Sequence, residues 1–298
     1  MSNVKFEGIL SAIVTPFCED NKTVNTSAAK ALIDRQLSEG ARGFYVLGGT
    51  GEGFMMAREE REIMCQTVID HVAGRVPVIA HVAAANLEEA IALAGHAERA
   101  GATAIAAIPP TLFSYSDDDI YNYYKAIAES VHLPVIVYYF PGAQAYMSAK
   151  LITRIFEIDN VTGVKWSSND LYEMMKVKDM THGEMNIISG GDEILLSAFA
   201  AGADAGIGST FNVMMKDFVS IYDDFKAGNF ERALETQLKV NRVLDLLVER
   251  ELIPAVKLAI KFTGIDVGTA KYPFKQFTKE EEASLEAELR ALGWPFQA

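Results

Sequence analysis

The sequence of 298 residues predicts an α/β fold, a (β/α)8 TIM barrel followed by a C-terminal helical extension. Strand-like apolar runs alternate with helical patterns up to residue 228, eight of each, and three helical patterns then follow with no strand between them. Strict alternation of this kind is typical of a parallel sheet closed as a barrel. A doubly wound open sheet is the rival fold, because periodicity alone does not show closure.

Each expected strand is a short apolar run bounded by glycine, proline or polar turn residues. The first, Ile9–Val14, runs into Thr15-Pro16-Phe17, and the second, Gly43–Leu47, runs into a glycine-rich loop. The other six are Val78–Val82, Ala104–Ile108, Val135–Tyr139, Val161–Val164, Ile187–Ser189 and Ala205–Ile207.

The helical patterns place apolar residues on one side, as Leu32, Ile33 and Leu37 do in the first. The eight barrel helices are expected at Ser27–Glu39, Arg58–Val72, Leu87–Arg99, Asp117–Ser130, Ala149–Glu157, Asp170–Lys178, Glu193–Ala200 and Met214–Lys226. The extension is expected at Phe230–Glu249, Pro254–Phe262 and Lys279–Ala291. The chain therefore divides into a barrel, residues 1–228, and an extension, residues 229–298, that packs on it as part of one catalytic unit.

Composition and charge exclude several classes of protein. The net charge of −13 and the lack of a basic run argue against binding to nucleic acid or to an anionic membrane surface. No apolar run approaches the ~20 residues that a membrane helix needs, and the N-terminus lacks the build of a signal peptide. Cys18 and Cys65 are too few for a disulfide framework and lack metal-ligand spacing. We expect a protein of the reducing cytoplasm.

One acidic cluster, Ser116-Asp117-Asp118-Asp119, could suggest a metal site. We interpret Ser116 as the N-cap of a helix and the three acids as its first turn, where they complement the helix dipole. No metal site is therefore expected.

Lys165 follows the short apolar strand Val161–Val164, at the end where a barrel of this class opens its active site. A buried ammonium is costly, and burial favours the neutral amine that a Schiff base needs. The alternative is a lysine whose stem merely carries its charge out of the strand end to solvent.

Four further stretches fall at the carboxyl ends of other expected strands. Gly48–Gly53 lacks the lysine of a nucleotide loop and is either a carboxylate-binding turn or a structural one. Tyr138 carries a phenol that can exchange a proton, Ser189–Glu193 ends in two acids that could grip sugar hydroxyls, and Gly206–Thr210 is small and polar. Each stretch alone fits a structural interpretation, but their convergence around a lysine predicts an active site.

Together, Gly49–Glu52, Tyr138, Gly163-Val164-Lys165 and Gly206-Ile207-Gly208-Ser209 resemble, in order and spacing, motifs of the dihydrodipicolinate synthase / N-acetylneuraminate lyase family of pyruvate-dependent class I aldolases. The resemblance spans essentially the whole chain. It implies a (β/α)8 barrel with a C-terminal helical extension, assembled as a homotetramer. It also implies catalysis through a covalent lysine imine, with no metal or organic cofactor.

By the same resemblance, Lys165 would form the Schiff base with the 2-keto carbon, and Tyr138 would shuttle the proton. Thr50, with the backbone of Gly49 and Gly51, would hold the pyruvate carboxylate. The positions that contact the sugar portion in the sialic acid lyase branch correspond to Ser167, Gly190, Asp192, Glu193 and Ser209.

The chain also departs from family patterns. The synthase branch places an arginine shortly after the strand-5 proline, whereas Gly142-Ala143-Gln144-Ala145 follows Pro141 here, which argues against dihydrodipicolinate synthesis. Gly49 replaces the usual hydroxyl residue, as in the keto-deoxy-sugar-acid dehydratase branch. In the family, an aromatic residue of the strand-4 loop usually extends into the active site of a neighbouring subunit. Here that residue is either replaced by Leu112 or displaced to Phe113 or Tyr115.

The predicted function is reversible cleavage of N-acetylneuraminate to pyruvate and N-acetylmannosamine. The first alternative is an aldolase or dehydratase that acts on another 2-keto-3-deoxy sugar acid through the same lysine imine. A non-catalytic 2-keto-acid binding protein is the remote alternative, and the presence of both Lys165 and Tyr138 argues against it.

Overall fold

The computed structural model describes residues 5–141 and 146–295. Eight parallel strands form a closed barrel in chain order. The strands are β1 (Gly8–Ala12), β2 (Gly43–Val46), β3 (Val78–His81), β4 (Ala104–Ala107), β5 (Val135–Tyr139), β6 (Val161–Trp166), β7 (Asn186–Ser189) and β8 (Ala205–Gly208). Because β1 pairs with both β2 and β8, the sheet has no edge. The closure confirms the predicted (β/α)8 TIM barrel over the open-sheet alternative.

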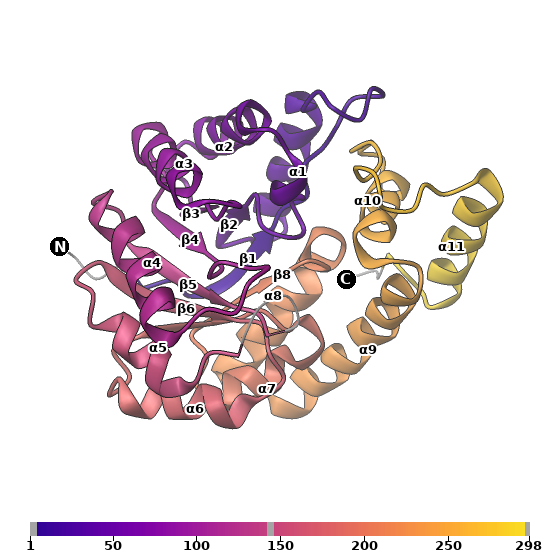
Figure 1. Cartoon of the computed structure of the whole chain (residues 1–298). Coiled ribbons are helices and arrows are strands. Elements are labelled where there is room, and N and C mark those ends of the chain that lie inside the picture. Colours follow the sequence, from indigo (N-terminus) through magenta and orange to yellow (C-terminus); the bar gives the residue numbers. More distant parts are fainter. Residues whose placement is uncertain (1–4, 142–145, 296–298) are drawn as a thin grey trace.

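Helices follow the strands and surround the barrel (Figure 1). They are α1 (Thr26–Ser38), α2 (Arg58–Val72), α3 (Leu87–Ala100), α4 (Asp117–Glu129), α5 (Ala149–Phe156), α6 (Leu171–Met180), α7 (Leu195–Ala200) and α8 (Phe211–Ala227), with short 3-10 helices η1 (Gly53–Met55) and η2 (Asp192–Ile194). The helix expected at Glu193–Ala200 is therefore divided between η2 and α7. The helix expected from Met214 begins at Phe211 instead. Met214 itself has a non-helical backbone and forms a kink inside α8.

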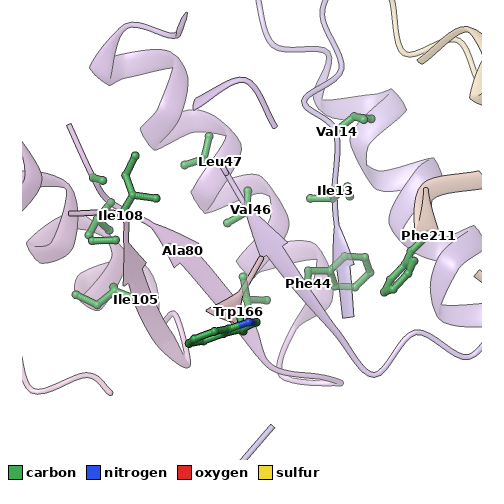
Figure 2. Packing of buried hydrophobic residues seen from close by; sticks show 14 of the residues in the cluster. Ile13, Val14, Phe44, Val46, Leu47, Ala80, Ile105, Ile108, Trp166 and Phe211 are labelled. Atoms are coloured by element: carbon green, nitrogen blue, oxygen red, sulfur yellow. The ribbon is translucent and has the colours of Figure 1, made fainter. Parts of the chain in front are cut away.

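Two apolar layers build the core, and the alternation of each strand divides its side chains between them. The outer layer lies between strands and helices and includes Phe44, Ile105 and Trp166 (Figure 2). The inner layer fills the barrel with residues such as Leu10 and Ile136, and Tyr138 packs against it. Both layers consist of buried apolar side chains, so the inside of the barrel is a packed core. In such a barrel the active site lies at the carboxyl ends of the strands.

A β-bulge in β6 decides which way Lys165 faces. Val135 pairs with Val161, but the next residue of β5 pairs with Gly163, so Thr162 is the extra residue. Without this bulge the alternation of β6 would turn Lys165 toward the helices. With it, Val164 and Trp166 join the outer layer and Lys165 points into the barrel. The strand also continues past the expected end at Val164, so Lys165 lies within it.

The extension consists of α9 (Phe230–Glu249), α10 (Leu252–Phe262) and α11 (Lys279–Ala291), as expected. α9 and α10 pack on α8, and α11 packs outside α10 (Figure 1). Residues 254–260 of α10 are buried on every side of the helix, which is typical of a helix enclosed by other elements. The division of the chain at residue 228 stays a prediction.

Candidate active site

Lys165 lies at the centre of the carboxyl-terminal face of the barrel and is 5% exposed. Its Nζ donates a hydrogen bond of 2.9 Å to Ser167 Oγ. The same atom lies 3.8 Å from the centroid of the Tyr138 ring and 5.5 Å from that of the Tyr45 ring. The amine is therefore held by one hydroxyl and two aromatic faces, with its reactive atom in the cavity described below.

Tyr138 is the register partner of Lys165 on the neighbouring strand, β5. Its ring stacks on Phe140 at an interplanar angle of 11° and meets Tyr45 and His81 edge to face. Aromatic pairs in these geometries fix ring orientation. The phenol ring is thus held next to the lysine amine, and the role of Tyr138 as a proton shuttle stays a prediction.

Tyr45 and His81 pack against Tyr138 behind the cavity lining and were not among the predicted residues. Both are buried, and the Tyr45 hydroxyl has no hydrogen-bond partner among the described residues. Burial raises the pKa of Tyr45 well above its usual value and lowers the pKa of His81 to about 3, so both rings are neutral near pH 7. A histidine inside the apolar run Val78–Val82 was the signal in the sequence that could have indicated this position.

The glycine loop after β2, Gly48–Gly53, is held by hydrogen bonds to Thr15 and Ser209. The Thr15 hydroxyl donates a hydrogen bond of 2.6 Å to Gly51 O. The hydroxyls of Thr50 and Ser209 share a hydrogen bond of 2.6 Å. Gly49 is exposed, and an added Cβ there would meet nothing within 4 Å, so crowding does not explain the missing hydroxyl at this position.

Gly190 lies so close to Lys165 and Ser167 that a side chain there would displace the Ser167 hydroxyl. An added Cβ would lie 1.9 Å from Ser167 Oγ and 3.0 Å from Lys165 Nζ. Glycine at this position therefore leaves the space that the lysine amine and its hydroxyl partner occupy.

Asp192 and Glu193 enter the site on η2. Asp192 Oδ2 accepts hydrogen bonds from the backbone N–H of Thr210, 2.8 Å, and from its hydroxyl, 2.7 Å. Burial raises the pKa of Asp192 to about 6, although these hydrogen bonds oppose the shift. Gln237 and Asn241 of α9 donate hydrogen bonds of 2.9 Å to the carbonyls of Asp192 and Glu193, so the extension holds this acidic turn in place.

A cavity of about 390 Å³ joins these groups. Every predicted site residue except Gly51 lines it, namely Gly49, Thr50, Tyr138, Lys165, Ser167, Gly190, Asp192, Glu193 and Ser209. Gly51 is a buried residue of the glycine loop. The extension supplies an apolar wall that the sequence reasoning missed, made of Leu244, Val248, Leu252, Ile253 and Phe274. A larger cavity of about 570 Å³ lies between the β1–α1 loop and the extension, away from the lysine.

Other predicted features have simple placements. Ser116 caps α4, with Asp119 completing the capping box, so the acidic cluster is a helix start as interpreted. Leu112 and Phe113 are 90% and 74% exposed on the loop between β4 and α4. The segment Gly142-Ala143-Gln144-Ala145 lies outside the described residues. Within residues 5–141 and 146–295, we find no cluster of three metal-ligating side chains and no helix long and apolar enough to span a membrane.

Comparison with known proteins identifies the family. The profile of the dihydrodipicolinate synthetase family matches residues 5–292. The chain belongs to this family. An N-acetylneuraminate lyase of Rhizobium meliloti is 32% identical over 98% of this chain and 97% of its own length. Relatives of this kind support the predicted enzyme class, a carbon–carbon lyase.

Two solved structures share the fold of this chain. The N-acetylneuraminate lyase of Proteus mirabilis superposes with a TM-score of 0.93 at 28% identity, over 98% of this chain and all of that one. A prophage protein of Escherichia coli K12 from the dihydrodipicolinic acid synthase family, solved in complex with pyruvate, gives a TM-score of 0.91 at 25% identity, over 97% of this chain and 99% of that one.

Proposed function

We propose that the protein is a Schiff-base aldolase that reversibly cleaves N-acetylneuraminate to pyruvate and N-acetylmannosamine. The observation that carries the proposal is the approach of Lys165 Nζ to 3.8 Å from the Tyr138 ring inside a cavity lined by the glycine loop. The family match supports aldol chemistry, and the names of the relatives support this sugar acid.

The proposed cleavage begins with the neutral amine of Lys165, which attacks the C2 carbonyl, and the carbonyl oxygen leaves as water. The resulting iminium accepts electrons as the C3–C4 bond breaks. Tyr138 gives its proton to the departing carbonyl oxygen in the first step, and the phenolate left behind takes the proton of the C4 hydroxyl, so C4 becomes the aldehyde of N-acetylmannosamine. The enamine left behind is protonated at C3, and water then hydrolyses the imine to release pyruvate and the free lysine. No step of this sequence calls for a metal or an organic cofactor.

The proposed carboxylate site is the glycine loop. The backbone N–H groups of Gly49 and Gly51 and the Thr50 hydroxyl would supply the donors, since closely spaced groups of this kind hold anions. The fixed positions of Gly51 and Thr50, through Thr15 and Ser209, keep these donors from having to reorganise when substrate binds.

The sugar portion would lie toward Ser167, Gly190, Asp192, Glu193 and Ser209, all of which line the cavity. Glu193 is half-buried and has a carboxylate available for sugar hydroxyls. Asp192 accepts a hydrogen bond from the Thr210 hydroxyl, and its carboxylate lines the cavity together with Glu193.

A second candidate is an aldolase or dehydratase that acts on another 2-keto-3-deoxy sugar acid. Gly49 and the apolar wall from Leu244 to Phe274 favour it, because the wall offers few partners to a long hydroxylated chain. The remote alternative, a non-catalytic 2-keto-acid binder, would retain the cavity but release no pyruvate.

We further propose a homotetramer in the cytoplasm. The exposed apolar side chains of Leu112 and Phe113 support contact with a neighbouring subunit, because large apolar groups on a loop are common at interfaces. Size-exclusion chromatography with light scattering tests the assembly, and a mass of one chain would contradict it.

The activity test measures pyruvate release from N-acetylneuraminate and, in parallel, from 2-keto-3-deoxygluconate. Rapid release from the first substrate alone is the expected result. Release from the second alone would transfer the assignment to the second candidate. Release from neither would contradict the sialic acid assignment and leave a dehydratase, an aldolase for a different 2-keto-3-deoxy sugar acid, or the binding protein.

A further inference from the structure

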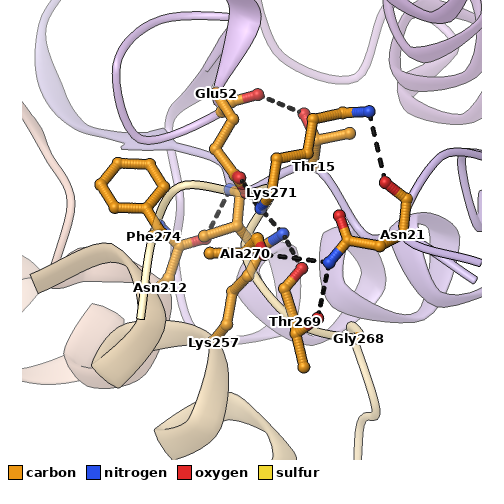
Figure 3. Close-up of polar contacts among 12 residues, drawn as sticks. Thr15, Asn21, Glu52, Asn212, Lys257, Gly268, Thr269, Ala270, Lys271 and Phe274 are labelled. Carbon is orange, nitrogen blue, oxygen red and sulfur yellow. Dashed lines mark hydrogen bonds and ion pairs between the residues drawn. The ribbon is translucent and has the colours of Figure 1, made fainter. Parts of the chain in front are cut away.

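The acid that ends the glycine loop, Glu52, is buried and faces a buried lysine of the extension. Glu52 Oε1 lies 2.5 Å from Nζ of Lys257 on α10, and the two side chains are 0% and 1% exposed (Figure 3). The two residues are separated by most of the chain. An ion pair with so little solvent contact is rare, since both charges lose their hydration.

The partners of this pair continue into the segment that follows α10. The second oxygen, Glu52 Oε2, accepts a hydrogen bond of 2.6 Å from the backbone N–H of Lys271. Lys257 Nζ also donates a hydrogen bond of 3.0 Å to Thr269 O. One carboxylate therefore holds both α10 and residues 269–271 against the glycine loop.

The neighbouring groups complete the charge balance. Nζ of Lys271 pairs with Glu60 Oε1 at 2.8 Å. The Phe17 ring lies beside both amines, with its centroid 4.3 Å from Lys257 Nζ and 4.6 Å from Lys271 Nζ. Two cations, two carboxylates and one aromatic face thus form a compact unit between the barrel and the extension.

Both sides of this unit lead directly into the active-site cavity. On the barrel side, Glu52 follows Gly51 and has a left-handed backbone conformation with a φ of 57°. Residues other than glycine rarely adopt this conformation. On the extension side, α10 also carries Leu252 and Ile253, which line the cavity, and Phe274 follows shortly after Lys271. A displacement at the ion pair would therefore move the proposed carboxylate donors relative to the apolar wall.

Stability alone does not account for this arrangement, because well-packed apolar residues often stabilise a core as well as a buried ion pair does. We propose that Glu52 and Lys257 are positioning residues that set the glycine loop against the extension, so that its N–H donors face the carboxylate of a 2-keto acid. The inference rests on the proposed function, since that function supplies the carboxylate. Neither residue lines the cavity, so both act through the loop.

The test uses a double variant, Glu52→Gln with Lys257→Met, because either single change leaves one buried group without its partner. The double variant removes both charges at similar size, and it is expected to fold. We expect the KM for the 2-keto acid substrate to rise by roughly tenfold or more while kcat changes much less, which is the signature of lost ground-state binding. A merely structural pair would affect the thermal transition and leave KM unchanged.

A matched control replaces an ion pair of the extension that lies away from the loop, Arg250→Met with Glu288→Gln. This control is expected to retain the native KM. A second test variant, Glu52→Asp, keeps both charges but shortens the side chain, and we expect an intermediate rise in KM. It keeps the inference testable if the double variant does not fold.

Pyruvate trapping separates this inference from the proposed function. The native protein and the variants are titrated with pyruvate, and the imine is reduced with borohydride at each concentration. Half-maximal labelling at a higher pyruvate concentration in the double variant, or in Glu52→Asp, supports the inference. Unchanged half-maximal labelling and KM in the folded variants overturn it alone. Native protein that traps no pyruvate overturns the proposed function and this inference together.

Discussion

Lys165 and Tyr138 face each other as register partners on β6 and β5, with the lysine Nζ 3.8 Å from the centre of the phenol ring. The contact exists only because the bulge at Thr162 turns Lys165 into the barrel. It brings the proposed nucleophile and the proposed proton carrier together in one cavity, and two contributions of Tyr138 can be tested separately. In the proposed mechanism, the ring face stabilises positive charge on the lysine or the iminium, whereas the hydroxyl transfers protons.

Replacing Tyr138 by phenylalanine removes the hydroxyl and keeps the ring. We expect kcat for pyruvate release to fall by roughly 10²–10⁴-fold, as for a lost acid–base group, while borohydride still traps pyruvate on the protein. The matched control is Tyr139→Phe, because Tyr139 lies next in the chain but packs on Trp166 in the outer layer. Near-native turnover in Tyr138→Phe would assign the proton transfer to another group.

Gly190→Ala places a methyl group 1.9 Å from the present position of Ser167 Oγ and 3.0 Å from that of Lys165 Nζ, so the hydroxyl must move away from the amine. We expect pyruvate release to fall by roughly 10²-fold, because displacement of a reacting atom by about 1 Å can cost that much. Gly95→Ala in α3 is the control, since its methyl group would meet only the flexible end of Arg99, at 3.2 Å. An active Gly190→Ala enzyme would show that the lysine does not need its present position.

The raised pKa of Asp192 predicts a loss of activity on the acidic side of the pH profile of kcat/KM. Its pKa is raised to about 6, chiefly by burial, so the carboxylate loses its charge as the pH falls through 6. We expect kcat/KM to fall over the same interval and this loss to be absent in Asp192→Asn. Asp217→Asn is the control, because burial also raises the pKa of that carboxyl, on α8. A loss that persists in Asp192→Asn would belong to another group.

The raised pKa of Asp192 affects stability in the opposite direction to activity as the pH changes. The folded protein holds the Asp192 proton more tightly than the unfolded chain does, because the folded pKa exceeds the ordinary value of 3.8. The stabilisation by this proton is complete below pH 3.8 and is lost as the pH rises through about 6. Activity therefore gains from ionisation of Asp192, while stability does not.

Chelation is expected to leave the reaction unaffected, because the imine itself accepts the electrons of the breaking bond. The check is pyruvate release before and after dialysis against EDTA, with the thermal transition measured on the same samples. Loss of activity that added divalent cations restore would contradict a purely lysine-based mechanism.

The fold could be predicted because apolar runs and helical periods are local properties. All eight strands and the helices of the extension were expected close to their observed bounds. Closure of the barrel was predicted from the strict alternation and the family resemblance, but periodicity alone could not show it, since closure depends on the pairing of β1 with β8, which lie far apart in the sequence. The bulge at Thr162 was missed for the same reason, because a bulge is defined by the partner strand.

The candidate site was predicted where chemistry-bearing residues end a strand, as at Thr50, Tyr138, Lys165 and Ser209. Residues that act through tertiary contacts were not found. Tyr45 resembles any aromatic residue of an apolar strand until its ring is seen beside Lys165. The pairing of Glu52 with Lys257 and the apolar wall at Phe274 join segments about 200 residues apart, beyond the reach of local patterns.

The most direct test of the central claim is identification of the residue that pyruvate modifies. The protein is incubated with pyruvate, reduced with borohydride, digested and mapped by mass spectrometry, with Lys165→Ala treated in parallel. The proposed mechanism predicts one N-(1-carboxyethyl) group on Lys165, no adduct in Lys165→Ala, and no pyruvate release from sugar acids by that variant. An adduct on a different lysine, or near-normal turnover by Lys165→Ala, would contradict the assignment of Lys165 as the Schiff-base nucleophile.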